Sequence, residues 1–205
     1  MNVFKCKVPD DTFNKLKIKI SKVAEKDFYG KDLAGNIKKE YSMNADFKEL
    51  SNFLIGNINS FAPLEDYVKK IVKQYLQDDS LTVELCLYNL WVNLMAQNEF
   101  NPLHIHEGVF SFIIFVKVPY KIEEMRKNAP GIKSNSNVAG ALEFVKGNSD
   151  TINDLTSLQI HADETWEQQC LIFPSVLNHC VYPFYKVDDY RITVSGNLAL
   201  KRKNA

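Results

Sequence analysis

The sequence predicts a mainly β fold with a helical N-terminal part, in which a jelly roll is flanked by helices. Apolar residues follow a helical spacing up to about residue 80, and from there to about residue 200 they alternate as in strands. Roughly eight short strands, separated by breaks rich in Asn, Pro, Gly and Asp, are typical of a closed β-sandwich.

The first 80 residues are expected to hold one weak strand and three helices. Residues 3–8 alternate weakly and predict the strand. Residues 16–20 also alternate, so a strand stays open there. Acidic residues at the start and apolar residues at helical spacing predict helices over 10–24, 47–58 and 64–76, with a polar loop over 27–44 between the first two.

Alternating or apolar segments predict the strands of the sandwich, and the helices are expected to pack outside them. The expected strands cover 81–88, 109–118, 141–145, 158–161, 169–173, 178–182 and 190–200. The longest break, 120–139, is charged and then rich in Ser, Asn and Gly. A loop of this length in a compact domain is usually functional, so we expect a substrate lid.

Composition narrows the class of protein. Lys and Arg together number 25, as do Asp and Glu, and this balance argues against a nucleic-acid partner. The four cysteines form no Cys-x-x-Cys pair. Residues 1–7 lack the basic-then-apolar pattern of a signal peptide, and the apolar run 112–116 is far too short to cross a membrane. A reduced, cytoplasmic protein is therefore expected.

Three of the four histidines fall in two short motifs. His104 and His106 stand two residues apart, so a strand would direct both imidazoles to one face. His179 follows a predicted strand end and a turn at Pro174. Such a pair, joined by one histidine from a later strand, can hold one metal ion and leave open coordination positions, as in non-haem Fe(II) oxygenases.

Arg191 and Thr193 form the third element of the candidate site. They lie on the strand expected after His179 and share one face. A guanidinium fork and a hydroxyl together suit a carboxylate ligand. His161 has no partner at ligand spacing and is expected beside the site or at the surface. Cys180 is expected to point away from the metal and pack in the core.

Several motifs together resemble the iron(II)/2-oxoglutarate-dependent dioxygenase superfamily, in particular prolyl-hydroxylase-like oxygenases of bacteriophages and marine bacteria. The resemblance spans roughly residues 87–198, about half of the chain. The motifs are Trp91–Asn93, Asn101–His106, Ser111–Phe115, Gly140–Phe144, Phe173–His179, Arg191–Thr193 and Ser195–Asn197.

The resemblance implies a double-stranded β-helix of the cupin-like type and an Fe(II)/2-oxoglutarate-dependent hydroxylase. One domain over 1–205 is expected, with a mostly helical support region at 1–80 and the metal-bearing core at 81–200. The resemblance places Fe(II) on His104, His106 and His179. It assigns 2-oxoglutarate binding to Arg191, Thr193 and Asn93, and catalysis to the histidines with Arg191.

By the same resemblance, the enzyme consumes O2 and 2-oxoglutarate and releases succinate and CO2. The substrate would be a prolyl or other peptidyl side chain, or a small molecule. A phage-encoded chain would work in the host cytoplasm. The helical first 80 residues could support a homodimer, which the sequence does not demand.

Two departures from the superfamily pattern affect the expected site. A carboxylate usually stands at the position of His106, so the ligand set here would be neutral; Glu107 or Asp163 could supply a carboxylate instead. Phe115 replaces a tyrosine that often binds the co-substrate. Arg191 and Thr193 would then carry more of that binding.

Two alternatives remain open. A cupin-type metalloenzyme could use the same histidines without 2-oxoglutarate, although the Glu that follows the His-x-His element in cupins is absent and Arg191 would have no role. A non-catalytic jelly-roll module that binds sugar or protein is the other, because fold alone does not fix function.

Overall fold

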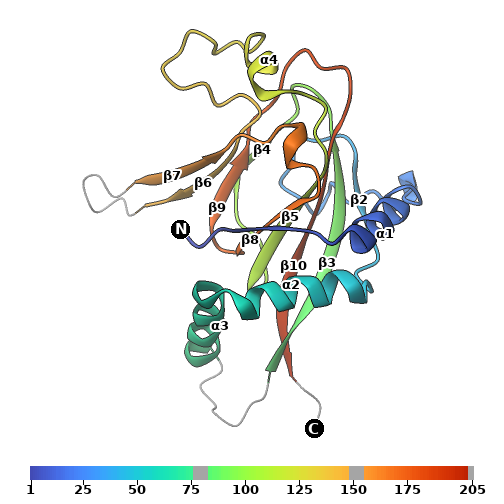
Figure 1. Ribbon diagram of the computed structural model, residues 1–205, viewed down its shortest axis with the longest axis vertical. Coiled ribbons are helices and arrows are strands. Elements are labelled where there is room, and N and C mark those ends of the chain that lie inside the picture. The colour runs from blue at the N-terminus through green and yellow to red at the C-terminus, as the bar shows by residue number, and fades with distance from the viewer. Residues whose placement is uncertain (76–82, 148–154, 203–205) are drawn as a thin grey trace.

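The computed structural model describes residues 1–75, 83–147 and 155–202, and these form two antiparallel sheets, with the three N-terminal helices packed on one face of the larger sheet (Figure 1). The mainly β prediction is confirmed, and the architecture is that of a double-stranded β-helix. The helices are α1 (Asp10–Ile20), α2 (Lys48–Ser60), α3 (Ala62–Tyr75) and α4 (Ile122–Arg126), with 3-10 turns η1 (Glu25–Asp27) and η2 (Glu164–Trp166).

A six-stranded sheet forms the centre of the molecule and a four-stranded sheet faces it. The large sheet has the order β1 (Phe4–Lys7), β8 (Gln169–Pro174), β5 (Phe110–Lys117), β10 (Arg191–Arg202), β3 (Val83–Met95) and β2 (Glu40–Ser42). The small sheet has the order β4 (Asn101–His104), β9 (Asn178–Val181), β6 (Leu142–Lys146) and β7 (Thr156–Ile160). Two strands from the first 42 residues thus complete the edges of the large sheet.

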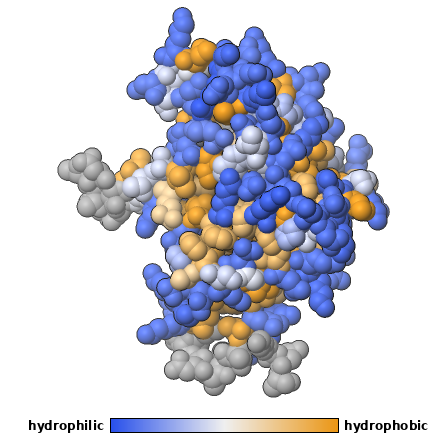
Figure 2. Space-filling view, viewed as in Figure 1, coloured by the Kyte–Doolittle hydropathy of each residue, from blue (hydrophilic) through white to orange (hydrophobic). Residues whose placement is uncertain are grey.

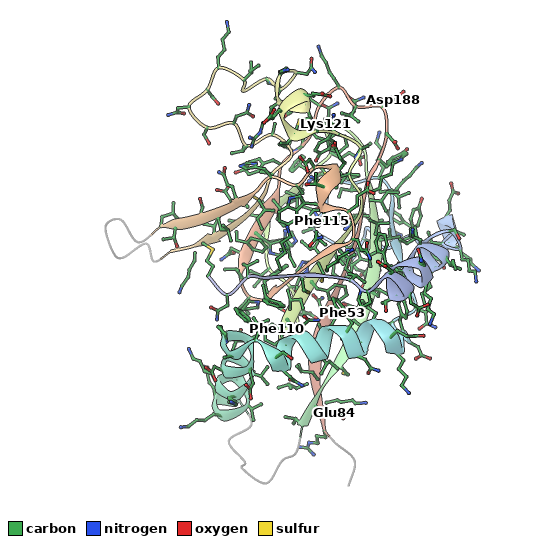
Figure 3. The ribbon with its side chains drawn as sticks, in the orientation of Figure 1. Phe53, Glu84, Phe110, Phe115, Lys121 and Asp188 are labelled. Atoms are coloured by element: carbon green, nitrogen blue, oxygen red, sulfur yellow. The ribbon has the colours of Figure 1, made fainter. Side chains whose placement is uncertain are left out.

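Both faces of the large sheet are buried, each in its own apolar cluster. On β5, Phe110 and Phe112 pack with the helices, whereas Ile113 and Phe115 pack between the two sheets. Figure 3 shows Phe110 near α2 and α3 and Phe115 in the interior. Because successive side chains on a strand point to opposite faces, β5 reads as one continuous apolar run rather than an alternating pattern.

An irregularity in β3 decides which of its side chains face the small sheet. The pairing of β3 with β10 shifts by one residue around Tyr88, which has no partner on β10 and is 56% exposed. Leu87 and Leu90 therefore both pack on the helical side. Beyond the shift, Trp91 and Asn93 line the pocket between the sheets. A β-bulge of this kind exchanges the faces of all later residues.

The predicted helices and strands differ from the observed ones at positions where contacts distant in the sequence determine the secondary structure. Residues 16–20 end helix α1 rather than forming a strand. The expected loop 27–44 contains β2, because Glu40–Ser42 pairs with β3. The expected loop 120–139 contains α4, whose Met125 is buried between the sheets. Leu76, Leu81 and Thr82, which fell at predicted element ends, lie outside the described residues.

The surface is largely polar on the side seen in Figure 2, with apolar side chains interspersed over the middle of the molecule. Among the described residues, none of the helices combines the length and apolar character that a membrane span requires.

Two glycines provide a matched test of this packing. A Cβ at Gly196, on β10, would collide with the backbone oxygen of Asn89 and lie 2.8 Å from two ring carbons of Phe112. We expect Gly196→Ala to lower the free energy of unfolding by about 2–4 kcal/mol, because the buried backbone has no room to shift.

A Cβ at exposed Gly56, in α2, meets nothing within 4 Å. Gly56→Ala should raise stability by about 0.5–1 kcal/mol. Urea unfolding measures both, and equal stability of the two variants would contradict the packing described here.

Candidate metal centre

The small sheet brings together the three histidines of the two sequence motifs. His104 and His179 are direct partners on neighbouring strands β4 and β9. His106 follows the end of β4 instead of lying on the strand, which corrects the expectation for the His-x-His pair. The possible ligand atoms of all three residues lie within 4.8 Å of one another.

Local backbone contacts fix the orientation of two of these rings. The Nδ1–H of His104 donates to the carbonyl oxygen of Pro102 at 2.7 Å, and that of His179 donates to Leu177 at 2.9 Å. Because a carbonyl can only accept, both rings carry their proton on Nδ1. Each Nε2 is left with a free lone pair, which is the tautomer a metal ligand needs.

Burial keeps the cluster neutral. Desolvation, with a smaller contribution from His104, lowers the pKa of His106 to about 4 and that of His179 to about 3. Desolvation also lowers the pKa of His104. Neutral imidazoles do not have to lose a proton before they bind a metal ion, so the cluster is prepared for coordination at neutral pH.

A buried polar network holds the His106 segment in place. The hydroxyl of Ser111 donates to the Asn197 side-chain oxygen at 2.7 Å, and it lies 3.2 Å from the hydroxyl of Ser175. The carbonyl of Ser175 in turn accepts the backbone N–H of His106 at 2.9 Å. Three of the sequence motifs therefore converge beneath one histidine, and their serines and asparagine have a structural role there.

The other candidates raised from the sequence lie apart from the cluster. Among the described residues, the metal-capable group holds only the three histidines. Glu107 is exposed, and the Asp163 carboxylate accepts bonds from Thr165. His161 contacts Arg126. Cys180 is only partly buried, so the expectation that it packs in the core was wrong. Leu103 and Ile105, the neighbours of His104, are exposed, so the segment that carries His104 and His106 lies near the surface.

Arg191 occupies the same pocket with its charge unpaired. Its side chain is 4% exposed, and its guanidinium donates to the Tyr120 hydroxyl at 3.2 Å and to the Gly140 carbonyl at 3.0 Å. It takes part in no ion pair with another described residue. A buried charge without a counterion is costly, so this position suits an anionic ligand.

Thr193 and Phe115 lie beside Arg191 as the sequence suggested. Thr193 pairs with Phe115 on β5 and with Asn93 on β3, so the three residues share one face of the large sheet. The Asn93 amide lies 3.4 Å from the Thr193 hydroxyl. Phe115 offers no hydroxyl to a ligand, which leaves Arg191 and Thr193 as the donors at this end.

One pocket, with an empty volume of about 700 Å³ that includes its open mouth, is lined by all of these groups. The large sheet, the small sheet and the segment before β2 all contribute to its walls. The polar and aromatic lining residues are Glu40, Trp91, Asn93, Asn101, His104, His106, Phe115, His179, Arg191, Thr193 and Ser195.

The sequence analysis missed two polar residues of the pocket. Glu40 is 1% exposed, and its Oε2 has no hydrogen-bond partner among the described residues; the same holds for the side-chain oxygen of Asn101. Burial, and then the charge of Glu99, raises the pKa of Glu40 to about 7. Asn101 belonged to a recognised motif without an assigned role. Glu40 gave no signal, since it is one acidic residue in a polar stretch.

The fold and the site are those of a jelly-roll metal-dependent oxygenase, and the comparison with protein families agrees. Residues 89–197, just over half of the chain, match the model of a family described as "Putative 2OG-Fe(II) oxygenase". The chain belongs to this family. None of the curated proteins matches it.

Three solved structures are similar to the chain at low sequence identity, and one of them reaches a TM-score of 0.5. The chain superposes on a 2OG-Fe(II) oxygenase family oxidoreductase from Burkholderia pseudomallei with a TM-score of 0.51 and 8% identity, over 96% of this chain and 84% of that one. A Pseudomonas putida prolyl-4-hydroxylase gives 0.47 and 10% identity, over 99% and 93%. The viral collagen prolyl hydroxylase of Paramecium bursaria Chlorella virus-1, in complex with 2OG, gives 0.48 and 9%, over 97% and 96%.

Fe(II) and 2-oxoglutarate are therefore the metal and the co-substrate, and the residues present fit both. Three neutral imidazoles, two of them with Nε2 free, are of the nitrogen-donor type that could hold Fe(II). The buried guanidinium of Arg191, without an acidic partner among the described residues, suits a carboxylate of 2-oxoglutarate.

The lowered pKa of His179 predicts how the stability of the metal-free protein depends on pH. The unfolded chain takes up a proton near the ordinary pKa of 6.5, whereas the folded chain resists it until about pH 3. The contribution of neutral His179 is thus present above pH 6.5 and lost as the pH falls towards 3.

His179→Gln removes this titration. The stability difference between the metal-free wild type and this variant should shift in favour of the variant by about 2 kcal/mol between pH 7 and pH 5. Urea unfolding at the two pH values measures this, and the titrating groups that do not interact with His179 cancel in the comparison. A difference that does not change with pH would show that His179 is not buried as a neutral ring.

Proposed function

We propose that residues 1–205 act as one domain, an Fe(II)/2-oxoglutarate-dependent hydroxylase. The observation that supports this most is the presence, in one pocket, of a neutral three-histidine cluster and a buried, unpaired guanidinium. This chemistry requires the protein to supply two binding sites, one for the metal ion and one for a carboxylate of the co-substrate.

The histidines and the residues on β10 have separate roles in this proposal. His104, His106 and His179 hold Fe(II) through their ring nitrogens. Arg191 binds the carboxylate of 2-oxoglutarate that lies far from the metal, and Thr193 donates a hydrogen bond to the same carboxylate. Asn93 supports the Thr193 hydroxyl and, with it, the position of the co-substrate.

When bound, Fe(II) and 2-oxoglutarate supply the oxidation itself: O2 is consumed, one oxygen atom enters the substrate, and succinate and CO2 leave. The chain contributes orientation and shelter. Tyr120 and Gly140, at the two ends of the 120–139 segment, hold the guanidinium in place. Apolar Ile113, Phe115 and Leu142 exclude water around it.

A ligand set of three histidines, with no carboxylate from the described residues, changes the charge of the centre. With three neutral histidines, the metal keeps its full double positive charge, whereas a carboxylate ligand would reduce it by one. The interaction with the anionic co-substrate is correspondingly stronger in a buried pocket, where charges are poorly screened. This compensates for the hydroxyl that Phe115 cannot supply.

The substrate in this proposal is a prolyl or other peptidyl side chain, or a small molecule, and it reaches the metal through the mouth of the pocket. The enzyme is proposed to work in the cytoplasm. A homodimer built on the helical region is a further part of the proposal. The cupin-type alternative gives buried Arg191 no role. A binding module that holds no metal gives the three clustered imidazoles no role.

The test is an anaerobic titration of the metal-free protein with Fe(II) and then 2-oxoglutarate. Chelation of the co-substrate should produce a weak visible metal-to-ligand charge-transfer band. Iron binding without this band would favour the cupin-type alternative, and failure to bind iron would favour the non-catalytic module.

Two substitutions separate the metal from the co-substrate. His179→Ala should abolish stable iron binding, because two ligands hold Fe(II) poorly. Arg191→Gln should keep iron but raise the 2-oxoglutarate concentration needed for half the band by about 10- to 100-fold, since a charge-assisted pair is lost.

Arg126→Gln is the matched control, because Arg126 is a partly buried arginine that does not line the pocket. It should leave both iron binding and the 2-oxoglutarate requirement unchanged. An Arg191→Gln variant that behaved like this control would count against the role of Arg191.

A further inference from the structure

The large sheet forms a floor for the pocket that is acidic at one end. Glu40 on β2 pairs with Asn93 on β3, Asn93 pairs with Thr193 on β10, and Thr193 pairs with Phe115 on β5. Residues that pair directly share a face, so these side chains form one row across the sheet. Glu40 lies two strands from Arg191, a backbone separation of roughly 10 Å.

The polar atoms left unpaired at the Glu40 end are all hydrogen-bond acceptors when Glu40 is ionised. They are Oε2 of Glu40 and the side-chain oxygens of Asn93 and Asn101, each buried and without a partner among the described residues. Glu40 and Asn101 also approach each other, because oxygens of both would meet the same Cβ position at Gly35. Unpaired buried acceptors are costly, so this end of the pocket is built for a group that donates several hydrogen bonds.

The charge of the same region favours a cation. Glu40 and Glu99 are close enough to repel, and the carboxylate of Glu99 already accepts the backbone N–H groups of Lys38 and Ala96. No described residue forms an ion pair with Glu40. A bound cation would supply the missing counterion and reduce the repulsion between the two carboxylates.

The wall beside Glu40 suits an aliphatic chain. Leu33, Ala34 and Ile37, from the segment that precedes β2, line the pocket next to the acidic end. This segment is held in place where the backbone N–H of Asn36 donates to the carbonyl of Phe100 at 2.8 Å. A substrate with methylene groups and a charged tip would bury the former on these side chains and pair the latter with Glu40.

We propose that the substrate of this oxygenase carries an amino or guanidino cation on an aliphatic chain, as in a lysine or arginine side chain, and that Glu40 and Asn101 bind this cation. The proposal rests on the proposed function, because it names the substrate class of the same site. The pocket is then divided by charge: Arg191 takes the anionic co-substrate, and Glu40, two strands away, takes the cationic substrate.

Binding of blocked amino acids tests the proposal without turnover. The probes are the Nα-acetyl methylamides of lysine and arginine, and the norleucine derivative is the neutral control with a similar aliphatic chain. Calorimetry measures their binding to the metal-free protein and, under anaerobic conditions, to the protein loaded with Fe(II) and 2-oxoglutarate. We expect the lysine or arginine probe to bind at least tenfold more tightly than the norleucine probe.

Two isosteric substitutions assign the effect to Glu40. Glu40→Gln removes the charge but keeps the shape, and it should weaken binding of the cationic probe by about 10- to 100-fold. Glu143→Gln removes a carboxylate on β6, 9% exposed, that accepts hydrogen bonds from Gln159 and Tyr182 outside the pocket, and it should have no effect. Glu40→Gln should also retain the charge-transfer band, which shows that it folds and holds the co-substrate.

The outcomes separate this proposal from the proposed function. If the band forms but the norleucine probe binds as well as the cationic ones, or if Glu40→Gln binds them like the wild type, the assignment of the substrate class is wrong and the oxygenase stands. If no cationic probe binds, the same conclusion holds. If the wild type gives no band, the oxygenase function fails, whereas preferential binding to the metal-free protein would still support a cation site at Glu40.

Discussion

The large sheet must bury both of its faces, and the rest of the structure depends on this constraint. One face lies under the helices and the other lies against the small sheet, so the buried apolar side chains of β3, β5, β8 and β10 divide between the two apolar clusters. A shift by one residue in such a strand exchanges the two faces for every later side chain. The bulge at Tyr88 is such a shift, and it lets leucines cover the helical side on both sides of it while Trp91 and Asn93 enter the pocket.

The polar part of the pocket lies where the two sheets open towards the surface. The three histidines come from the small sheet and the loop after β4, whereas Arg191, Thr193, Asn93 and Glu40 come from the large one. A metal ion and an organic anion can therefore be held from opposite walls, each by residues on a rigid strand or anchored next to one. The acidic end adds a second charged region on the large sheet, at its β2 edge.

Much of this arrangement could be predicted from residue order, and the part that could not depends on contacts distant in the sequence. The sequence predicted the grouping of His104, His106 and His179 from the spacing of residues within two short motifs, and the structure brings the three side chains together. The family and the fold class were also confirmed. By contrast, β2 exists because Glu40–Ser42 finds an edge of β3, and its own three residues carry no strand pattern. Glu40 was missed for that reason, and Tyr88 because only the register with β10 reveals the bulge.

The hydrogen bonds of His104 and His179 to Pro102 and Leu177 have a consequence for the affinity of the site for its metal. Each ring is oriented by a carbonyl only two residues away. The conformational entropy of these two ligands is therefore lost when the chain folds and not when the metal binds. The free energy of metal binding is not reduced by the cost of ordering them, which is the advantage of a preorganised site.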